Sequence, residues 1–124
     1  GELLEQIGID ANSIVFTPHL LPIPRGILST IYVQFHEPQT RAKIMHIYRE
    51  FFAGSPMVRL HEHSLPQIQH SVRTNYSDVG FQLSFDGKRA VIVSCLDNLL
   101  KGASSQAVQN LNVMLGWNEA EGLE

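Results

Sequence analysis

The feature that most constrains the fold of this sequence is a pair of strand-like segments joined by a tight-turn signal. Residues 79–85 alternate apolar side chains with small or polar ones, which is the period-two pattern of a half-buried strand. Asp86 and Gly87 follow at once, a dipeptide typical of hairpin turns that need positive φ. Residues 89–96 then return with apolar side chains on both faces, which indicates a central strand covered on both sides.

Three further elements have clear patterns. Residues 27–35 alternate with β-branched side chains and predict a strand. Residues 39–52 predict an amphipathic helix with Pro38 in its first turn. Residues 98–115 predict a last helix, capped by Asp97 and ended by Gly116. The expected buried face of the first helix is Ile44, Ile47, Tyr48, Phe51 and Phe52, and that of the last is Leu100, Ala103, Ala107, Leu111 and Met114.

The remaining segments are shorter. Residues 2–7 resemble a helix end stopped by Gly8, and residues 13–17 and 57–60 predict short strands. Prolines make residues 18–26 an irregular loop, because each lacks a backbone donor. Residues 61–74 are polar and give no clear pattern. The order of elements predicts a single α+β domain over residues 1–124, with a mixed, largely antiparallel sheet and helices packed on it.

Composition excludes several classes of protein. The 124 residues carry a formal charge of −3, whereas a general nucleic-acid binder normally has a basic excess. The single cysteine, Cys95, excludes an intrachain disulfide framework and a cysteine-rich zinc site. No apolar run approaches the roughly 20 residues that span a membrane, and the N-terminus lacks a secretory pattern. We expect a cytoplasmic domain that binds neither nucleic acid nor membrane.

Arg25 and His19 lie at either end of the proline-rich part of the chain and are candidate binding residues. Stiff loops often carry function, and Arg25 beside Gly26 offers a bidentate fork to a carboxylate or phosphate. An ordinary ion pair on a surface loop explains the same residues equally well.

Asn98, Lys101 and Gly102 open the last helix, where unpaired backbone N–H groups favour an anion. Lys101 adds a positive charge. Close packing of the helix on the sheet explains the small residues at least as well, so this pattern alone is weak evidence for a site.

Two other candidates have plainer explanations. His61 and His63 would point the same way on a strand and could share a metal, but no third ligand is evident nearby, which favours a solvated polar loop. Cys95 lies inside an apolar strand, where a cysteine usually packs in the core and does not act as a nucleophile.

Three blocks of sequence, in order, resemble the N-acetyl-gamma-glutamyl-phosphate reductase family. The blocks are Phe16–Leu20 with Arg25–Tyr32, Leu65–Gln67 with Thr74–Tyr76 and Asp78, and Asp97–Ala103 with Gln106–Asn110. Gly116-Trp117 closes the last helix as in the family. One block would be a weak signal, but three in the family's order cover most of the chain. Arg73 stands where many relatives carry glycine, and Ser77 where many carry cysteine.

The resemblance implies part of an enzyme of arginine biosynthesis that reduces an acyl phosphate to an aldehyde with NADPH. In such enzymes a cysteine attacks the acyl phosphate, the thioester accepts hydride, and a histidine handles protons. It also implies a fold like the C-terminal domain of glyceraldehyde-3-phosphate dehydrogenase, and a homo-oligomer. By the resemblance, Arg25 and His19 bind the small-molecule acyl-phosphate substrate, while Asn98, Lys101 and Gly102 lie near the nicotinamide of NADP.

The chain also departs from the family. It has no Gly-rich dinucleotide fingerprint, no Asn-Pro-Gly-Cys motif and no His-x-His-x-Pro-Glu motif, so we assign no catalytic residue to it. Cys95 and the pair His61 and His63 lie at the wrong places to replace those motifs. The chain is expected to be the C-terminal part of the enzyme, inactive alone, with NADP bound mainly by an absent Rossmann domain.

Two alternatives stay open. The chain could be a non-enzymatic dimerisation or interaction module with the same fold. It could also belong to the homologous acyl-phosphate reductase of lysine biosynthesis, whose substrate differs by one methylene. In the first case the open reading frame would begin immediately before Gly1, whereas an upstream Gly-rich fingerprint and Asn-Pro-Gly-Cys motif would indicate the reductase.

Overall fold

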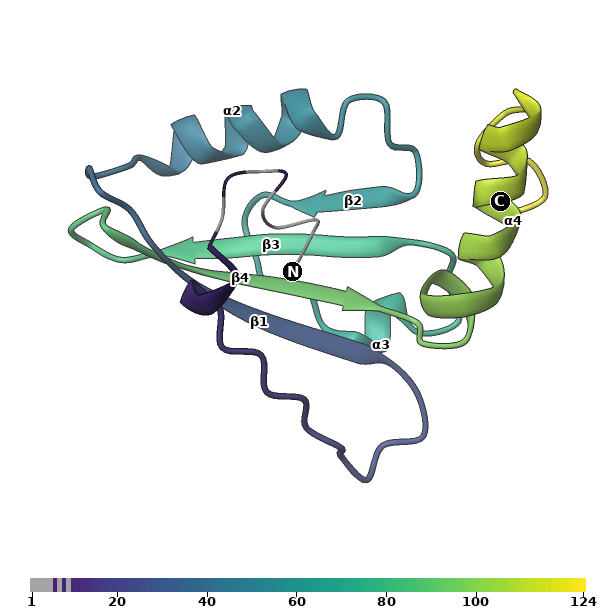
Figure 1. Ribbon diagram of the computed structural model, residues 1–124, viewed down its shortest axis with the longest axis horizontal. Helices are drawn as coiled ribbons and strands as arrows, with labels where there is room; N and C mark the ends of the chain where they lie inside the picture. The colour runs from purple at the N-terminus through teal and green to yellow at the C-terminus, as the bar shows by residue number, and fades with distance from the viewer. Residues whose placement is uncertain (1–5, 7, 9) are drawn as a thin grey trace.

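A four-stranded mixed sheet organises the fold in a computed structural model, which describes residues 6, 8 and 10–124 (Figure 1). The strands are β1 (Ile27–Gln34), β2 (Val58–His61), β3 (Ser77–Leu83) and β4 (Arg89–Leu96), in the spatial order β1-β4-β3-β2. β4 pairs antiparallel with both β1 and β3, while β2 runs parallel to β3. The predicted α+β class and the central place of residues 89–96 are therefore confirmed.

The hairpin between β3 and β4 has the predicted turn. The side chain of Ser84 donates to Asp86, and Gly87 has a φ of +70°. A Cβ on Gly87 would lie 2.5 Å from the backbone oxygen of Gln39. Glycine is needed here both for the left-handed backbone and for the close approach of the neighbouring segment.

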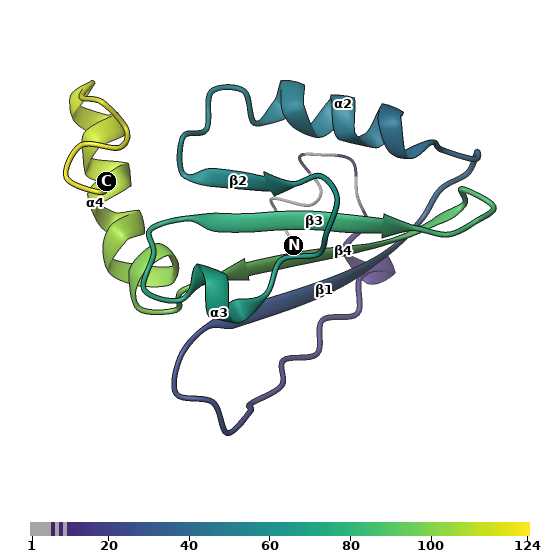
Figure 2. The same cartoon turned by 180° about the vertical axis from the view of Figure 1, so that it is seen from behind.

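α2 (Arg41–Phe51) covers the face of the sheet that carries Phe81 (Figures 1 and 2). Ile44 and Met45 are buried against Phe81, and the Tyr48 ring meets Phe81 edge-on at 5.6 Å. The helix begins at Arg41 because the hydroxyl of Thr40 caps it by accepting from the N–H of Lys43, so Pro38 lies before the helix and not in its first turn.

The predicted buried face of α2 is only partly correct. Ile44 is buried and Tyr48 half-buried, but Ile47 and Phe51 are 49% and 77% exposed. Met45, which the pattern missed, is buried instead. The helix therefore leans on the sheet along the row of Ile44 and Tyr48, with Met45 at its edge, and leaves part of its apolar stripe uncovered.

The last helix is preceded by a π-helical turn, η2 (Leu100–Ser104), and continues as α4 (Ser105–Leu115), ending at Gly116 with a φ of +69°. The prediction that its apolar stripe is buried is wrong. Met114 is 82% exposed and Leu111 49% exposed, and the alanines of the stripe are exposed too. The buried residues of α4 are Ser105, Gln109 and Asn112.

The inverted burial of α4 follows from the C-terminal residues that fold back on it. The side chain of Asn112 donates to the backbone oxygens of Glu119 and Glu121, and the Gln109 side chain donates to that of Glu119. The Ser105 hydroxyl donates to Asn75. Polar groups that find partners in this way can be buried without the cost of losing water.

Several shorter predictions fare differently. No strand forms over residues 13–17. A short helix, η1 (Ala11–Ser13), forms instead, because Asp10 accepts from Asn12 and Ser13. The proline-rich segment is irregular, as predicted, and its residues 18–24 are exposed. The unassigned stretch 61–74 contains the four-residue helix α3 (Ile68–Ser71). The predicted helix end at residues 2–7 falls largely outside the described residues. In the part of the chain that the structure describes, no helix is long and apolar enough to cross a membrane.

Candidate functional site

Asp97 is the centre of the cluster that holds most of the predicted site residues. It lies directly after β4, has no exposed surface, and accepts hydrogen bonds through both carboxylate oxygens. Oδ1 accepts from the N–H groups of Leu99 and Leu100 at 2.8 and 2.9 Å, as expected of a capping side chain, although the helical segment begins at Leu100 and Leu99 holds the N-cap position. Oδ2 accepts from the N–H of Arg73 at 2.6 Å and forms an ion pair with Nε of Arg25 at 2.7 Å.

The electrostatics of Asp97 favour the carboxylate. Burial alone would raise its pKa, but the N–H groups of Arg73, Leu100 and Leu99, together with the Arg25 guanidinium, stabilise the negative charge and lower the pKa to about 2. Asp97 is therefore ionised near neutral pH, and it joins the proline-rich segment, the turn at Arg73 and the start of the last helix.

Asn98 and Gly26 form a second tie beside Asp97. Oδ1 of Asn98 accepts from the N–H of Gly26 at 2.8 Å. Gly26 has a φ of +109°, and a Cβ there would lie 2.5 Å from Cγ2 of Ile68 in α3. Only glycine allows the chain to pass this close to α3 with that backbone, so the chain directly after Arg25 is held in place.

Arg25 opens onto a shallow pocket between the proline-rich segment and α3. The pocket is lined by Ile23 and Arg25 on one side and by Gln67, Ile68 and Gln69 on the other. The side chain of Arg25 is 28% exposed, while its partner Asp97 is fully buried. The structure thus brings Arg25 and Asn98 together around Asp97 and presents Arg25 to solvent.

The other predicted site residues are explained by contacts within the chain. Nζ of Lys101 donates to the side chain of Gln109, and burial lowers the pKa of Lys101 although Glu119 works in the opposite direction. A Cβ on Gly102 would lie 3.1 Å from the backbone oxygen of Asp97, so glycine there suits close packing. His19 is exposed, lies within hydrogen-bond distance of the backbone oxygen of Thr17 in its own loop, and is not among the described residues that line the pocket. The roles predicted for these residues remain predictions.

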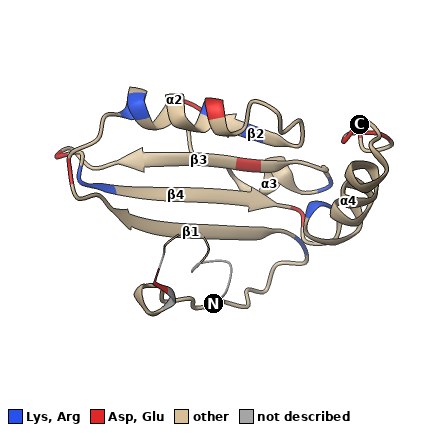
Figure 3. Cartoon of the chain, turned by 45° about the horizontal axis from the view of Figure 1, so that its top comes forward, with Lys and Arg blue, Asp and Glu red and all other residues tan. Residues whose placement is uncertain are grey.

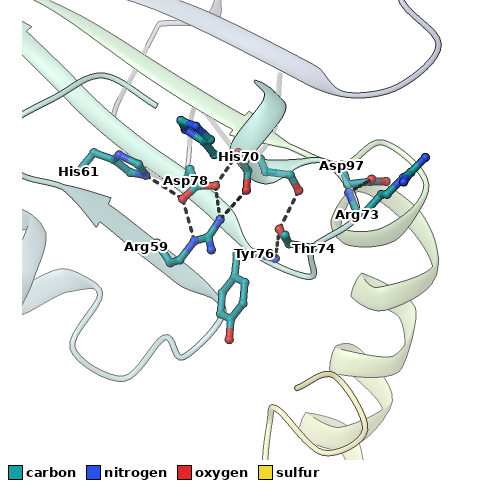
Figure 4. A network of polar contacts seen from close by, with 9 residues as sticks. Arg59, His61, His70, Arg73, Thr74, Tyr76, Asp78 and Asp97 are labelled. Carbon is teal, nitrogen blue, oxygen red and sulfur yellow. Dashed lines mark hydrogen bonds and ion pairs between the residues drawn. The ribbon is translucent and has the colours of Figure 1, made fainter. Parts of the chain in front are cut away.

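A second buried carboxylate, Asp78, lies on β3 and is held by side chains (Figure 4). Arg59 donates to both of its oxygens, at 2.8 and 2.7 Å, and lies over the ring of Tyr76 at 4.6 Å. The Ser71 hydroxyl donates at 2.5 Å, and Nε2 of His61 lies 2.9 Å from Oδ1. Burial would raise the pKa of Asp78, but Arg59, Ser71 and His61 hold it below its usual value.

The three residues considered for other chemistry, Cys95, His61 and His63, have ordinary structural roles. Cys95 is fully buried on β4, and burial, with a smaller contribution from Asp78, raises the pKa of its thiol. A raised pKa and no exposure suit core packing. His61 belongs to the Asp78 network, whereas His63 is exposed beyond the end of β2. No group of three metal-ligating side chains is found among the residues described.

The sequence did not identify the ion pair of Asp97 with Arg25. It also gave no sign of the contact between Asp78 and Arg59, or of Gln67 and Ile68 as residues that line the pocket. The signal for Asp97 was visible only as a cap, because its other partners come from distant segments of the chain. Asp78 directly precedes the predicted strand pattern of residues 79–85, and only the structure, in which β3 begins at Ser77, places this aspartate within the strand.

Comparisons with known proteins identify the family and the fold of the chain. Residues 2–98 match the family model described as the semialdehyde dehydrogenase dimerisation domain. The chain is similar to proteins named N-acetyl-gamma-glutamyl-phosphate reductase. The protein from Caldicellulosiruptor saccharolyticus is 43% identical, and the match covers 94% of this chain and 34% of that protein. The protein from Methanococcus maripaludis is 44% identical, with 99% of this chain and 36% of that protein covered. The protein from Geobacter sulfurreducens is 47% identical, with 90% of this chain and 33% of that protein covered.

The chain thus spans about a third of the length of these curated relatives. Among solved structures, aspartate semialdehyde dehydrogenase II from Vibrio cholerae matches with a TM-score of 0.59 at 18% identity, over 77% of this chain and 28% of that one. The same enzyme complexed with ASA gives a TM-score of 0.58 at the same identity and coverage. These likenesses show a shared fold.

Proposed function

This chain belongs to the semialdehyde dehydrogenase dimerisation-domain family, and from that premise we propose that it forms the C-terminal part of an N-acetyl-gamma-glutamyl-phosphate reductase. The observation that carries the proposal is 43–47% identity along nearly the whole chain to proteins of that name. The complete enzyme would reduce N-acetyl-glutamyl phosphate to N-acetyl-glutamate semialdehyde in the arginine biosynthesis of the cytoplasm.

In this proposal residues 1–124 form one α+β domain, and a Rossmann domain elsewhere in the polypeptide binds NADP, which supplies the hydride. The predicted cofactor residues of this chain form no dinucleotide cradle by themselves. Lys101 is tied to Gln109, Asn98 to Gly26, and Gly102 is packed on Asp97. Their contribution would be to shape the edge of a site that another part of the protein completes.

The outward face of the last helix supports a larger protein. Val108, Leu111 and Met114 are 40%, 49% and 82% exposed, and Trp117 just beyond the helix is 57% exposed. An apolar stripe left open on a helix commonly marks a surface that another part of the molecule covers. The family model for dimerisation ends at residue 98, before this helix, so we assign the stripe to the rest of the same polypeptide.

A homo-oligomer formed through β1 is the second part of the proposal. β1 lies at the edge of the sheet and carries no charged residue (Figure 3). Its apolar side chains are exposed on both faces, with Ile31 at 48% and Tyr32 at 80%. An uncharged, exposed edge strand is the kind of surface that pairs with another chain.

The proposed catalytic role of this chain is to position substrate, and the chemical steps fall to residues outside it. Its only cysteine is buried with a raised pKa, which makes it unsuited to attack an acyl phosphate. Arg25, and by the weaker argument from resemblance His19, would bind the anionic groups of the substrate. Holding those groups equally in the ground and transition states lowers KM and keeps the substrate at the site.

The test is reconstitution of activity. NADPH consumption with N-acetyl-glutamyl phosphate would be measured for the complete polypeptide, for this chain alone, and for this chain mixed with the remaining part. Activity is expected in the first and third samples and absent in the second. A complete polypeptide that binds no NADPH and reduces no acyl phosphate would support the non-enzymatic module instead. Sedimentation at micromolar concentration would test the oligomer, and a strictly monomeric protein would contradict it.

A further inference from the structure

We propose that the pocket between the proline-rich segment and α3 binds an oxyanion carried on an apolar stem, and that Asp97 positions Arg25 for it. The inference deepens the function proposed above, since it rests on that function to identify the oxyanion as a carboxylate or phosphate group of the substrate. It adds Gln67 and Ile68 as ligand contacts and Asp97 as a positioning residue.

The first step is the orientation of Arg25. Its buried Nε lies 2.7 Å from the buried Oδ2 of Asp97, so the ion pair anchors the inner edge of the guanidinium, although Nε makes no hydrogen bond within the described part of the chain. Within the described part of the chain, no hydrogen bond engages Nη1 or Nη2, and the side chain lines the pocket. A guanidinium fixed at Nε presents its two outer nitrogens as a fork, which is the geometry that carboxylate and phosphate oxygens match.

The second step concerns charge. Asp97 does not cancel Arg25 at the pocket, because its carboxylate is buried and shared with the N–H groups of Arg73, Leu99 and Leu100. Among the described residues that line the pocket, Arg25 is the only charged one. An incoming anion therefore meets the exposed side of a cation and no competing carboxylate.

The third step concerns the opposite wall. The side-chain oxygen of Gln67 accepts from Gln69 at 2.8 Å, which leaves the amide nitrogen of Gln67 as the donor it can offer. Ile23 and Ile68 supply apolar surface beside these donors. A pocket with one arginine fork, one amide donor and two isoleucines suits an anionic group at the end of a short carbon chain.

The test uses the complete polypeptide and two probes that separate the sources of the oxyanion, inorganic phosphate and N-acetylglutamate, titrated by calorimetry. Gln67→Glu places a carboxylate in the pocket without touching Asp97 and is expected to weaken the binding of the preferred probe by about tenfold or more. Gln82→Glu is the matched control, because Gln82 is exposed on β3, away from the pocket, and adds the same charge. An equal loss of probe affinity in the two variants would overturn the proposal that this pocket binds the oxyanion.

The positioning role needs a different measurement. Arg25→Lys and Asp97→Asn are each expected to raise the substrate KM several-fold while kcat stays within about twofold, because the lost contact is made in both ground and transition states. If Asp97 acts through Arg25, adding Asp97→Asn to Arg25→Lys causes little further change in KM. A fully additive second loss would overturn the positioning role.

The outcomes also separate this inference from the proposed function. Probe binding that is sensitive to Gln67→Glu in a polypeptide without reductase activity would support the pocket and contradict the reductase. Reductase activity together with identical binding by Gln67→Glu and Gln82→Glu would support the reductase and contradict the pocket.

Discussion

Two fully buried carboxylates hold this domain together in opposite ways. Asp97, at the end of β4, is satisfied mainly by backbone N–H groups from two separate turns, with Arg25 as its one side-chain partner. Asp78, near the start of β3, is satisfied by the side chains of Arg59, Ser71 and His61. The first carboxylate fixes how the chain turns, whereas the second ties side chains together across a surface that is already folded.

The difference matters because backbone and side-chain donors respond differently when the carboxylate is lost. Side chains can rotate toward water, and Arg59 is already 40% exposed. Backbone N–H groups at a helix start or in a turn cannot move without unfolding their segment. A buried donor left without a partner costs about 1–3 kcal/mol.

The largest expected effect follows directly from this contrast. Asp97→Ala removes the acceptor of three backbone N–H groups and should lower the free energy of unfolding by about 4 kcal/mol. Asp78→Ala should cost about 2 kcal/mol, because two of its three partners, Arg59 and His61, are partly exposed and can reach solvent. Urea unfolding followed by circular dichroism would measure both, with exposed Asp86→Asn as the control. An equal or larger cost for Asp78→Ala would contradict the comparison.

Acid should act on both carboxylates, and most clearly on Asp97. Its pKa in the folded chain is about 2, against an ordinary value of 3.8. A lowered folded pKa contributes stability above the unfolded value, and that stability is lost as pH falls from about 4 toward 2. Thermal unfolding between pH 5 and pH 2 should show a smaller acid-induced drop in Tm for Asp97→Asn than for the parent chain. Parallel curves for the two proteins would contradict this assignment.

The same contrast shows what the sequence could predict. The strands, the hairpin and the capping role of Asp97 follow from local patterns, because turn and cap chemistry acts within a few residues. The ion pair of Asp97 with Arg25 and the tie of Asn98 to Gly26 join positions more than 70 residues apart, and only the folded sheet brings them together.

In the last helix, the local sequence pattern predicted the wrong buried face. Its apolar stripe was correctly recognised as a stripe, but the assumption that apolar means buried in this chain was wrong. The polar side is buried because the residues around Glu119 fold back and satisfy Gln109 and Asn112. A hydrophobic pattern tells which face seeks burial, and it does not say whether the covering surface belongs to the segment at hand.

Replacement by lysine should cost more stability at Arg59, the partner of Asp78, than at Arg25, the partner of Asp97. Arg59 contacts both oxygens of Asp78 and lies over Tyr76, so Arg59→Lys loses a bidentate contact and a stacked one, at a cost of about 1–2 kcal/mol. Arg25→Lys should cost under about 1 kcal/mol, because three N–H groups still hold Asp97. Urea midpoints of the two variants would show the order, and a reversed order would mean that Arg25 supports the fold more than the backbone donors do.

The smallest expected changes in stability come from two substitutions. One removes a side-chain donor to Asp78, and the other keeps a backbone donor to Asp97. Ser71→Ala deletes a buried hydroxyl that donates to Asp78 and should lower stability by about 1 kcal/mol. Arg73→Gly keeps the N–H that donates to Asp97 and relieves a φ of +63°, which a residue with a Cβ adopts at a cost of about 1 kcal/mol. The added flexibility of glycine in the unfolded chain offsets part of that gain, so Tm should stay level or rise by a few degrees. A clear loss of stability in Arg73→Gly would show that the Arg73 side chain, and not only its backbone, holds this turn in place.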